Sequence, residues 1–257
     1  MISGLNITDK TIKNLLAKRS GSIVKSIRDY KSGETFEELV ISRFAPFIGK
    51  SIAMIENELN TKVSKSPKAI SYSVCRAILD IKENSITEFE KANVMLKTIR
   101  LEPNGATLKE SMSFKNINYK DIVEEEEWTE SEWYNIIASH KFLFIVFRKN
   151  ANGNDDDAIF EDVFFWNMPK SDIDKVEAFW KDTRDKIKKG DYEHFIKLSE
   201  HPICHVRPKG RNSQDLAETP QGGMAKKYCY WLNSNYILNI IKNHRQNQLY
   251  NMKSNLL

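Results

Sequence analysis

The chain has 257 residues, of which 40% are hydrophobic and 29% charged, and its formal net charge at pH 7 is +4. Such a composition is typical of a globular protein with ample core material. No apolar run approaches the roughly 18 residues that a membrane helix needs, and the first residues turn polar too early for a signal peptide.

The N-terminal residues predict a basic extension. Residues 1–31 carry seven Lys and Arg against two Asp, and the stretch reads as a helix interrupted near Gly21. We expect residues 1–34 to be a linker or the tail of a preceding domain, and residues 35–257 to form one domain. Residues 205–257 are also basic, so the surface should be bipolar, with one pole available to a polyanion. On charge alone, a solvated helical surface is an equally good interpretation.

The first half of the predicted domain is helical. Apolar periodicity predicts two helices over residues 34–60, separated at Pro46, and a third over residues 70–83. Strands are then expected at residues 93–101 and 111–117, joined as a hairpin by Asn104-Gly105. A helix over residues 129–140 should begin at Thr129 as N-cap.

The second half alternates between strands and helices. The apolar run over residues 141–149 predicts a central strand buried on both faces, with a partner over residues 158–169. An amphipathic helix follows over residues 171–190, then a strand and loop over residues 201–210, and a closing strand and helix over residues 228–244. This order predicts an α/β (α+β) fold with a mixed sheet of five or six strands flanked by helices.

Three cysteines, none of them in a C-x-x-C pair, predict free thiols in a reducing cytoplasm. Their spacing does not favour a zinc site, and we expect no metal ligand among them. His201 and His205 are four residues apart, but Pro202 argues against a helix between them. We therefore interpret both as surface histidines.

The strand around Lys97 partly matches the core of metal-dependent nucleases. In that core an acid and a lysine lie two residues apart on one strand face, after an earlier acid. The carboxylates hold a divalent cation, and the lysine orients the attacking water. Here Met95 precedes Lys97. A thioether is a poor ligand for Mg²⁺, so the pattern is a nuclease core without its central acid.

Three stretches of the chain resemble the MutH family of GATC-specific endonucleases, and especially its Sau-three-A-type restriction enzymes. They are "ISYSVCRAILDIK…EFEKANVMLKTIRLEPNGATLKESMSF", "FLFIVF…FFWNMP…WKDTRDKIKKG" and "CHVRPKGRN…YCYWLNSNYILNII". They cover roughly residues 35–245 in the family's order. The resemblance implies a restriction-endonuclease-like, MutH-like fold.

The resemblance also implies roles for individual residues. Asp80 falls at a helix glutamate near the metal, Glu88 at the first catalytic acid, Met95 at the central glutamate and Lys97 at the catalytic lysine. Without the central acid the site should bind Mg²⁺ poorly. The chain then resembles the non-cleaving C-terminal half of a Sau-three-A-type enzyme. It would need no cofactor itself, whereas the full-length enzyme would use Mg²⁺.

The loop "HVRPKGRN" carries the predicted DNA contacts. The resemblance places Arg207 and Lys209 at positions that contact DNA, and Trp231 near an aromatic that helps to read the site. Arg207 suits guanine, because its planar fork matches the O6 and N7 acceptors. Lys209 and Arg211 suit phosphates. A second basic point is expected at Lys226 and Lys227. A solvated charged loop is the alternative interpretation.

Three hypotheses remain open from the sequence. In the first, the chain binds double-stranded GATC DNA and acts as the allosteric half beside a catalytic MutH-like domain of the same polypeptide. In the second, it is an active Mg²⁺-dependent endonuclease that uses Asp80, Glu88 and Lys97. In the third, the sheet only looks familiar and the protein does not bind nucleic acid.

Overall fold

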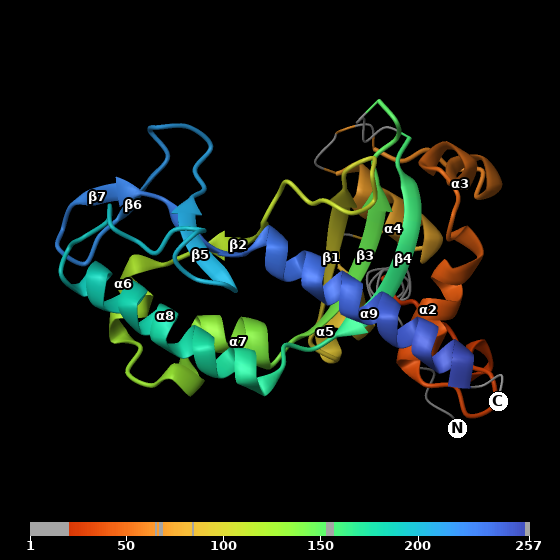
Figure 1. Cartoon of the computed structure of the whole chain (residues 1–257), viewed down its shortest axis with the longest axis horizontal. Helices are drawn as coiled ribbons and strands as arrows, with labels where there is room; N and C mark the ends of the chain where they lie inside the picture. The colour runs from red at the N-terminus through yellow and green to blue at the C-terminus, as the bar shows by residue number, and fades with distance from the viewer. Residues whose placement is uncertain (1–20, 65, 67–68, 84, 153–156, 255–257) are drawn as a thin grey trace, which may run out of the picture. The chain divides into compact units, whose positions relative to one another are not determined.

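The computed structural model describes residues 21–64, 66, 69–83, 85–152 and 157–254, which form two compact units (Figure 1). Unit 1 comprises residues up to Gly105 together with His140–Trp166, and unit 2 comprises Ala106–Ser139 with Asn167–Leu257. Each unit is therefore built from two separate stretches of the chain. Residues 1–20 of the predicted basic extension lie outside the described residues. The rest of that extension, from Gly21, contains one 3-10 turn, η1 (Ile27–Asp29), where the sequence predicts helix.

Unit 1 begins with short helices whose ends follow their sequence signals. The first, α2, starts after Thr35, whose side chain accepts from the Glu38 backbone while Glu38 bonds back to Thr35, which is a capping box. Pro46 lies in the 3-10 turn that separates α2 from the next helix, as predicted. The elements are α2 (Phe36–Phe44), η2 (Ala45–Phe47), α3 (Ile52–Glu58), α4 (Ile70–Ile78) and α5 (Thr87–Lys91).

The sheet of unit 1 is mixed, as the sequence predicts. It has the order β1 (Val94–Leu101), β3 (Lys141–Arg148), β4 (Ile159–Trp166), with β1 parallel and β4 antiparallel to β3. Every residue from Phe142 to Phe147 on β3 is 0% exposed, so the prediction of a central strand buried on both faces is confirmed. One face, with Leu143 and Ile145, packs into the core formed by the helices.

Unit 2 contains a second sheet, which is antiparallel, and a small hairpin. The sheet has the order β2 (Met112–Asn116), β8 (Tyr228–Leu232), β5 (Cys204–Pro208). The hairpin pairs β6 (Leu216–Glu218) with β7 (Met224–Lys226). Its helical elements are α6 (Tyr119–Glu124), η3 (Trp128–Glu130), α7 (Glu132–Ala138), α8 (Lys170–Lys188) and α9 (Ser234–Ser254).

Aromatic side chains join the helices of unit 2 to one face of its sheet. Tyr230 of β8 stacks on Trp133 of α7, with ring centroids 4.6 Å apart, and meets Phe179 of α8 edge-on at 5.7 Å. Because side chains alternate along a strand, Trp231 projects from the opposite face. His205 and Arg207 share that face with Trp231, since His205 pairs directly with it.

Three expectations about the elements are wrong in detail. The strands on either side of Asn104-Gly105 do not form a hairpin, because β1 pairs with β3 and β2 pairs with β8. Gly105 still makes a turn, with φ +65° and its N–H donating to the Glu102 carbonyl oxygen at 2.8 Å. The expected single sheet of five or six strands is instead three small sheets. Ser131, not Thr129, caps α7.

No helix in the described part of the chain is both long enough and apolar enough to cross a membrane.

Candidate functional site

The resemblance assigns four residues to a nuclease core, and all four lie in unit 1. Met95 and Lys97 lie on its edge strand β1, and Asp80 and Glu88 precede this strand. Val94 and Leu96 pack against the helical core, so strand alternation places Met95 and Lys97 on the opposite face. There Met95 is paired with Phe142, and Lys97 with Phe144. The sequence-based prediction that these two residues share one face agrees with this arrangement.

The strand beside Met95 and Lys97 offers aromatic rings rather than oxygen ligands. Phe144 stacks on Trp166 with ring centroids 5.5 Å apart, and Phe142 lies 5.6 Å from the same indole. A thioether packs well beside aromatic rings. Position 95 is thus suited to the methionine that it carries, and β3 supplies no carboxylate at these two positions.

Glu88 is engaged by the N-terminal segment. Its carboxylate accepts hydrogen bonds from the Ser22 hydroxyl, from the Ile23 N–H at 3.0 Å and from the Val24 N–H at 3.0 Å. Partial burial by itself raises the pKa of Glu88, but these hydrogen bonds outweigh burial and leave the pKa below its usual value. The first candidate acid therefore anchors residues 22–24.

Asp80 is bound by the same segment. It follows α4 with a positive φ of 54°, and its carboxylate lies 2.6 Å from the Lys25 ammonium. Both side chains are largely exposed, at 74% and 53%, so this ion pair contributes little stability. Together, Asp80 and Glu88 bind residues 22–25 within unit 1.

These residues do not fit a Mg²⁺ site. Magnesium needs oxygen ligands in near-octahedral geometry, whereas position 95 offers sulfur and Glu88 already accepts three hydrogen bonds. Within the described residues, no three His, Cys, Asp or Glu side chains gather in a way that would hold a metal ion.

The predicted DNA-contacting residues all lie in unit 2. Arg207 is exposed on β5, and its guanidinium carbon lies 4.3 Å from the centre of the Trp231 ring. The indole N–H of Trp231 donates to the Arg207 carbonyl oxygen at 3.4 Å. Among the described residues, no hydrogen bond or ion pair occupies the guanidinium N–H groups of Arg207. The Arg207 side chain therefore lies over a ring at an exposed position.

The loop after Arg207 is folded around Asp215. Its carboxylate accepts from the Arg211 N–H at 2.9 Å and pairs with the Lys227 ammonium. The hydrogen bond from Lys227 is the largest cause of a lowered pKa at Asp215, followed by the one from Arg211. Lys209 is also engaged, because its ammonium donates to the Phe114 carbonyl oxygen of β2. Lys209 and Lys227 thus have structural partners that the sequence did not indicate.

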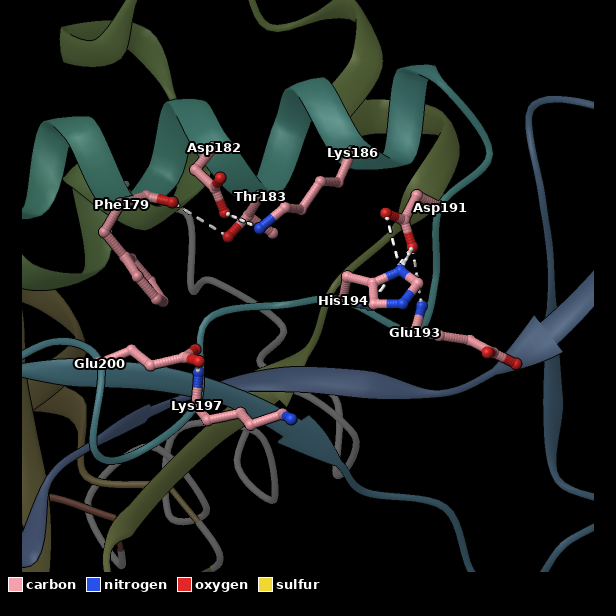
Figure 2. A network of polar contacts seen from close by, with 9 residues as sticks. All are labelled: Phe179, Asp182, Thr183, Lys186, Asp191, Glu193, His194, Lys197 and Glu200. Atoms are coloured by element: carbon pink, nitrogen blue, oxygen red, sulfur yellow. Dashed lines mark hydrogen bonds and ion pairs between the residues drawn. The ribbon is translucent and has the colours of Figure 1, made fainter.

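Lys226 and Arg211, which are also predicted to contact DNA, are exposed. Lys226 lines a cavity of about 510 Å³ between the β6–β7 hairpin and the loop after α8. Figure 2 shows that loop, in which Asp191 and His194 point toward each other, with 2.9 Å between a carboxylate oxygen and Nδ1. On α8 the side chains of Asp182 and Lys186 form an ion pair at 2.7 Å (Figure 2).

The sequence analysis missed two buried residues near Trp231, namely His205 and Asn233. His205, interpreted from the sequence as a surface residue, is only 2% exposed, and its Nδ1 lies 2.6 Å from the Asn233 side-chain oxygen. Alternation along β5 could not have revealed this burial, because it places His205 on the same face as the exposed Arg207.

Comparison with known proteins finds two similarities. The family model of the DNA mismatch repair enzyme MutH matches residues 79–178, which include β1, β3 and β4. The chain is also 29% identical over 243 residues to the type II restriction enzyme Sau3AI of Staphylococcus aureus, covering 82% of this chain and 48% of that enzyme. The chain therefore spans about half the length of the relative that it matches.

The two similarities agree with each other and with the sequence motifs, and the mixed α+β architecture is that of a restriction-endonuclease-like domain. Both similarities point to the MutH/Sau3AI-type family as the one that this chain resembles.

Proposed function

We propose that this chain binds double-stranded GATC DNA and regulates cleavage without cutting DNA itself. In this proposal it is the allosteric half of a type II restriction endonuclease, and its partner is a catalytic MutH-like domain in the same polypeptide. The observation that carries the proposal is the state of the nuclease core. Met95 lies beside Phe142, and Glu88 and Asp80 are bound by residues 22–25.

The match to Sau3AI supports a two-part enzyme, because it covers only 48% of that enzyme's length. A half that binds GATC and contacts a catalytic half can act as an effector site. Its DNA-bound state would stabilise the active state of the catalytic half by a coupling free energy of about 1–3 kcal/mol. The full enzyme would then need Mg²⁺, while this half would bind DNA without it.

The cations of unit 2 support DNA as the ligand. Arg207 lies over the Trp231 ring with guanidinium donors that no residue in the described part of the chain occupies, as a bidentate contact to guanine requires. Arg211 and Lys226 are exposed and suit phosphates. Lys209 and Lys227 add positive charge nearby, although their ammonium groups also bind protein oxygens.

Binding is tested with the intact chain and two short duplexes that differ only in the order of the GATC bases. Fluorescence anisotropy should give tighter binding to GATC and an affinity that falls steeply between about 50 and 200 mM salt. Arg207→Ala should weaken GATC binding by about 1–3 kcal/mol and lower the preference for GATC. Lys170→Ala on α8, where the lysine is 88% exposed, is the control for the loss of one positive charge and should change little.

Cleavage is tested separately with a plasmid that contains GATC sites and Mg²⁺. We expect no site-specific cuts by the intact chain. Clean cuts at GATC would instead support the active endonuclease that uses Asp80, Glu88 and Lys97. Equal, weak binding to both duplexes would contradict the proposed recognition of GATC.

A further inference from the structure

A buried polar pair, His205 and Asn233, lies next to Trp231 in the unit 2 sheet. Nδ1 of His205 is 2.6 Å from the side-chain oxygen of Asn233, and the two residues are 2% and 3% exposed. The Asn233 amide nitrogen donates to the His201 carbonyl oxygen at 2.6 Å and to the Leu198 carbonyl oxygen at 3.5 Å. Asn233 is thus held by the loop that precedes β5.

This arrangement defines the hydrogen-bonding state of His205. Because the Asn233 amide nitrogen donates to backbone carbonyl oxygens, its side-chain oxygen must face the imidazole. His205 therefore donates from Nδ1–H. Burial is the main cause that lowers the pKa of His205, which keeps the ring neutral near pH 7. The ring is fixed in both orientation and charge.

Trp231 rests beside this fixed ring. His205 and Trp231 are directly paired across β5 and β8, and their rings are nearly parallel, with an interplanar angle of 19° and 6.1 Å between centroids. Arg207, two residues further along β5, has its guanidinium carbon 4.3 Å from the same indole ring. On one face of the sheet, Trp231 therefore lies between the buried His205 and the exposed Arg207.

We propose that His205 is a positioning residue for DNA recognition: it holds the Trp231 ring, and through this ring it orients the guanidinium of Arg207. The inference rests on the proposed function, in which Arg207 contacts guanine. A preorganised arginine loses less conformational freedom on binding than a free one. His205 does not touch DNA itself, so its substitution should act only through Arg207.

A double-mutant cycle tests this dependence. Dissociation constants for the GATC duplex and the rearranged duplex are measured for the intact chain, His205→Ala, Arg207→Ala and the double variant. We expect Arg207→Ala to weaken GATC binding by about tenfold or more and His205→Ala to weaken it by roughly threefold to tenfold. The double variant should bind like Arg207→Ala alone, because the effect of His205 requires the guanidinium.

Lys226→Ala provides the matched control cycle. Lys226 is an exposed cation on β7, which belongs to a different sheet from Trp231, so His205→Ala and Lys226→Ala should have additive effects on binding free energy. If His205→Ala fails to fold, His205→Phe keeps an aromatic ring beside Trp231 and His205→Gln keeps a donor for Asn233. Both variants can enter the same cycle.

The outcomes separate the two proposals. If Arg207→Ala lowers GATC preference but His205→Ala adds to it independently, or has no effect, the positioning role is wrong and the proposed function stands. If Arg207→Ala leaves GATC preference unchanged, or the intact chain shows none, then guanine recognition by Arg207 is wrong and the positioning role falls with it.

Discussion

At the scale of single residues, Met95 and Glu88 are the informative positions of the nuclease core. Met95 is paired with Phe142, and a thioether suits such an aromatic neighbour. The three hydrogen bonds of Glu88 show that its carboxylate anchors residues 22–24. Each observation leads to a prediction for a single substitution.

Met95→Glu should not by itself restore a metal site. The new carboxylate would lie beside Phe142, which is 0% exposed, and Glu88 would still be hydrogen-bonded to residues 22–24. We expect the free energy of unfolding to fall by about 1–3 kcal/mol and Mn²⁺ titration calorimetry to show no stoichiometric binding. Met95→Leu is the control for loss of the thioether. A full equivalent of tightly bound Mn²⁺ in Met95→Glu would contradict this account.

Glu88→Gln should reduce stability in a pH-dependent way. The lowered pKa of Glu88 means that the ionised carboxylate favours the folded state above the unfolded pKa of about 4.3, and this contribution is lost as the pH falls through the folded pKa. We expect Glu88→Gln to cost about 1–2 kcal/mol at pH 7 and almost nothing near pH 3. Urea unfolding at both pH values measures this.

Glu90→Gln is the control for that experiment. Glu90 lies on the same helix, α5, but its side chain is exposed. Its substitution should leave the free energy of unfolding nearly unchanged at both pH values. An equal effect of the two substitutions would show that helix charge, rather than the anchoring of residues 22–24, determines the result.

At the scale of elements, the start of α7 shows how the N-cap predicted from the local sequence can differ from the one that the fold uses. The sequence predicts Thr129 as the N-cap, yet the structure uses Ser131, whose hydroxyl accepts from the Tyr134 N–H at 3.1 Å and donates to the Trp128 carbonyl oxygen at 2.7 Å. Ser131 is 0% exposed. The intervening η3 turn, which includes the buried Trp128, delays the start of the helix by two residues.

Ser131→Ala should therefore lower the free energy of unfolding by about 1–2 kcal/mol, through loss of the cap and of a buried hydrogen bond. Thr129→Ala, at the exposed position that the sequence favoured, should have an effect below about 0.5 kcal/mol. Chemical denaturation of the two variants gives the comparison. The reverse order of effects would mean that α7 begins at Thr129 in solution.

The loop around Asp215 leads to a prediction about binding. Asp215→Ala would release the Lys227 ammonium and remove the acceptor of the Arg211 N–H. Under the proposed function, the freed lysine should increase the steepness of the salt dependence by about one unit, while the loosened loop should reduce the preference for GATC. Anisotropy titrations over a salt series measure both quantities. An unchanged slope together with unchanged preference would argue against a role for this loop in DNA binding.

At the scale of the whole molecule, the chain forms two units from interleaved segments. β1 and its partner β3 are separated by residues 106–139, which belong to unit 2. One domain over residues 35–257 stays a prediction from the sequence. The candidate nuclease core lies in unit 1, while the predicted DNA contacts lie in unit 2.

A fragment that ends at Gly105 should therefore not fold. It would contain β1 without β3, its partner within the sheet, and would expose the core side chains that pack on Leu143 and Ile145. Circular dichroism and amide hydrogen exchange should show no cooperative unfolding for residues 21–105, whereas the intact chain should unfold cooperatively. A protected, cooperatively folded fragment would contradict the importance of the β1–β3 pairing.

The sequence by itself determined the fold class, the order of most elements and the shared strand face of Met95 and Lys97. These features follow from neighbours a few residues apart, through helical periodicity, strand alternation and turn residues. The family resemblance also came from local motifs, and the matches to MutH and Sau3AI agree with it.

Only the tertiary structure decided which strands pair and what each polar side chain binds. Asn104-Gly105 makes a turn, but whether a hairpin follows depends on competition from β3 and β8, which lie far along the chain. Ile23 and Glu88 are 65 residues apart in sequence, and His205 and Asn233 are 28 residues apart. Such contacts depend on long-range packing, which local composition and periodicity do not encode.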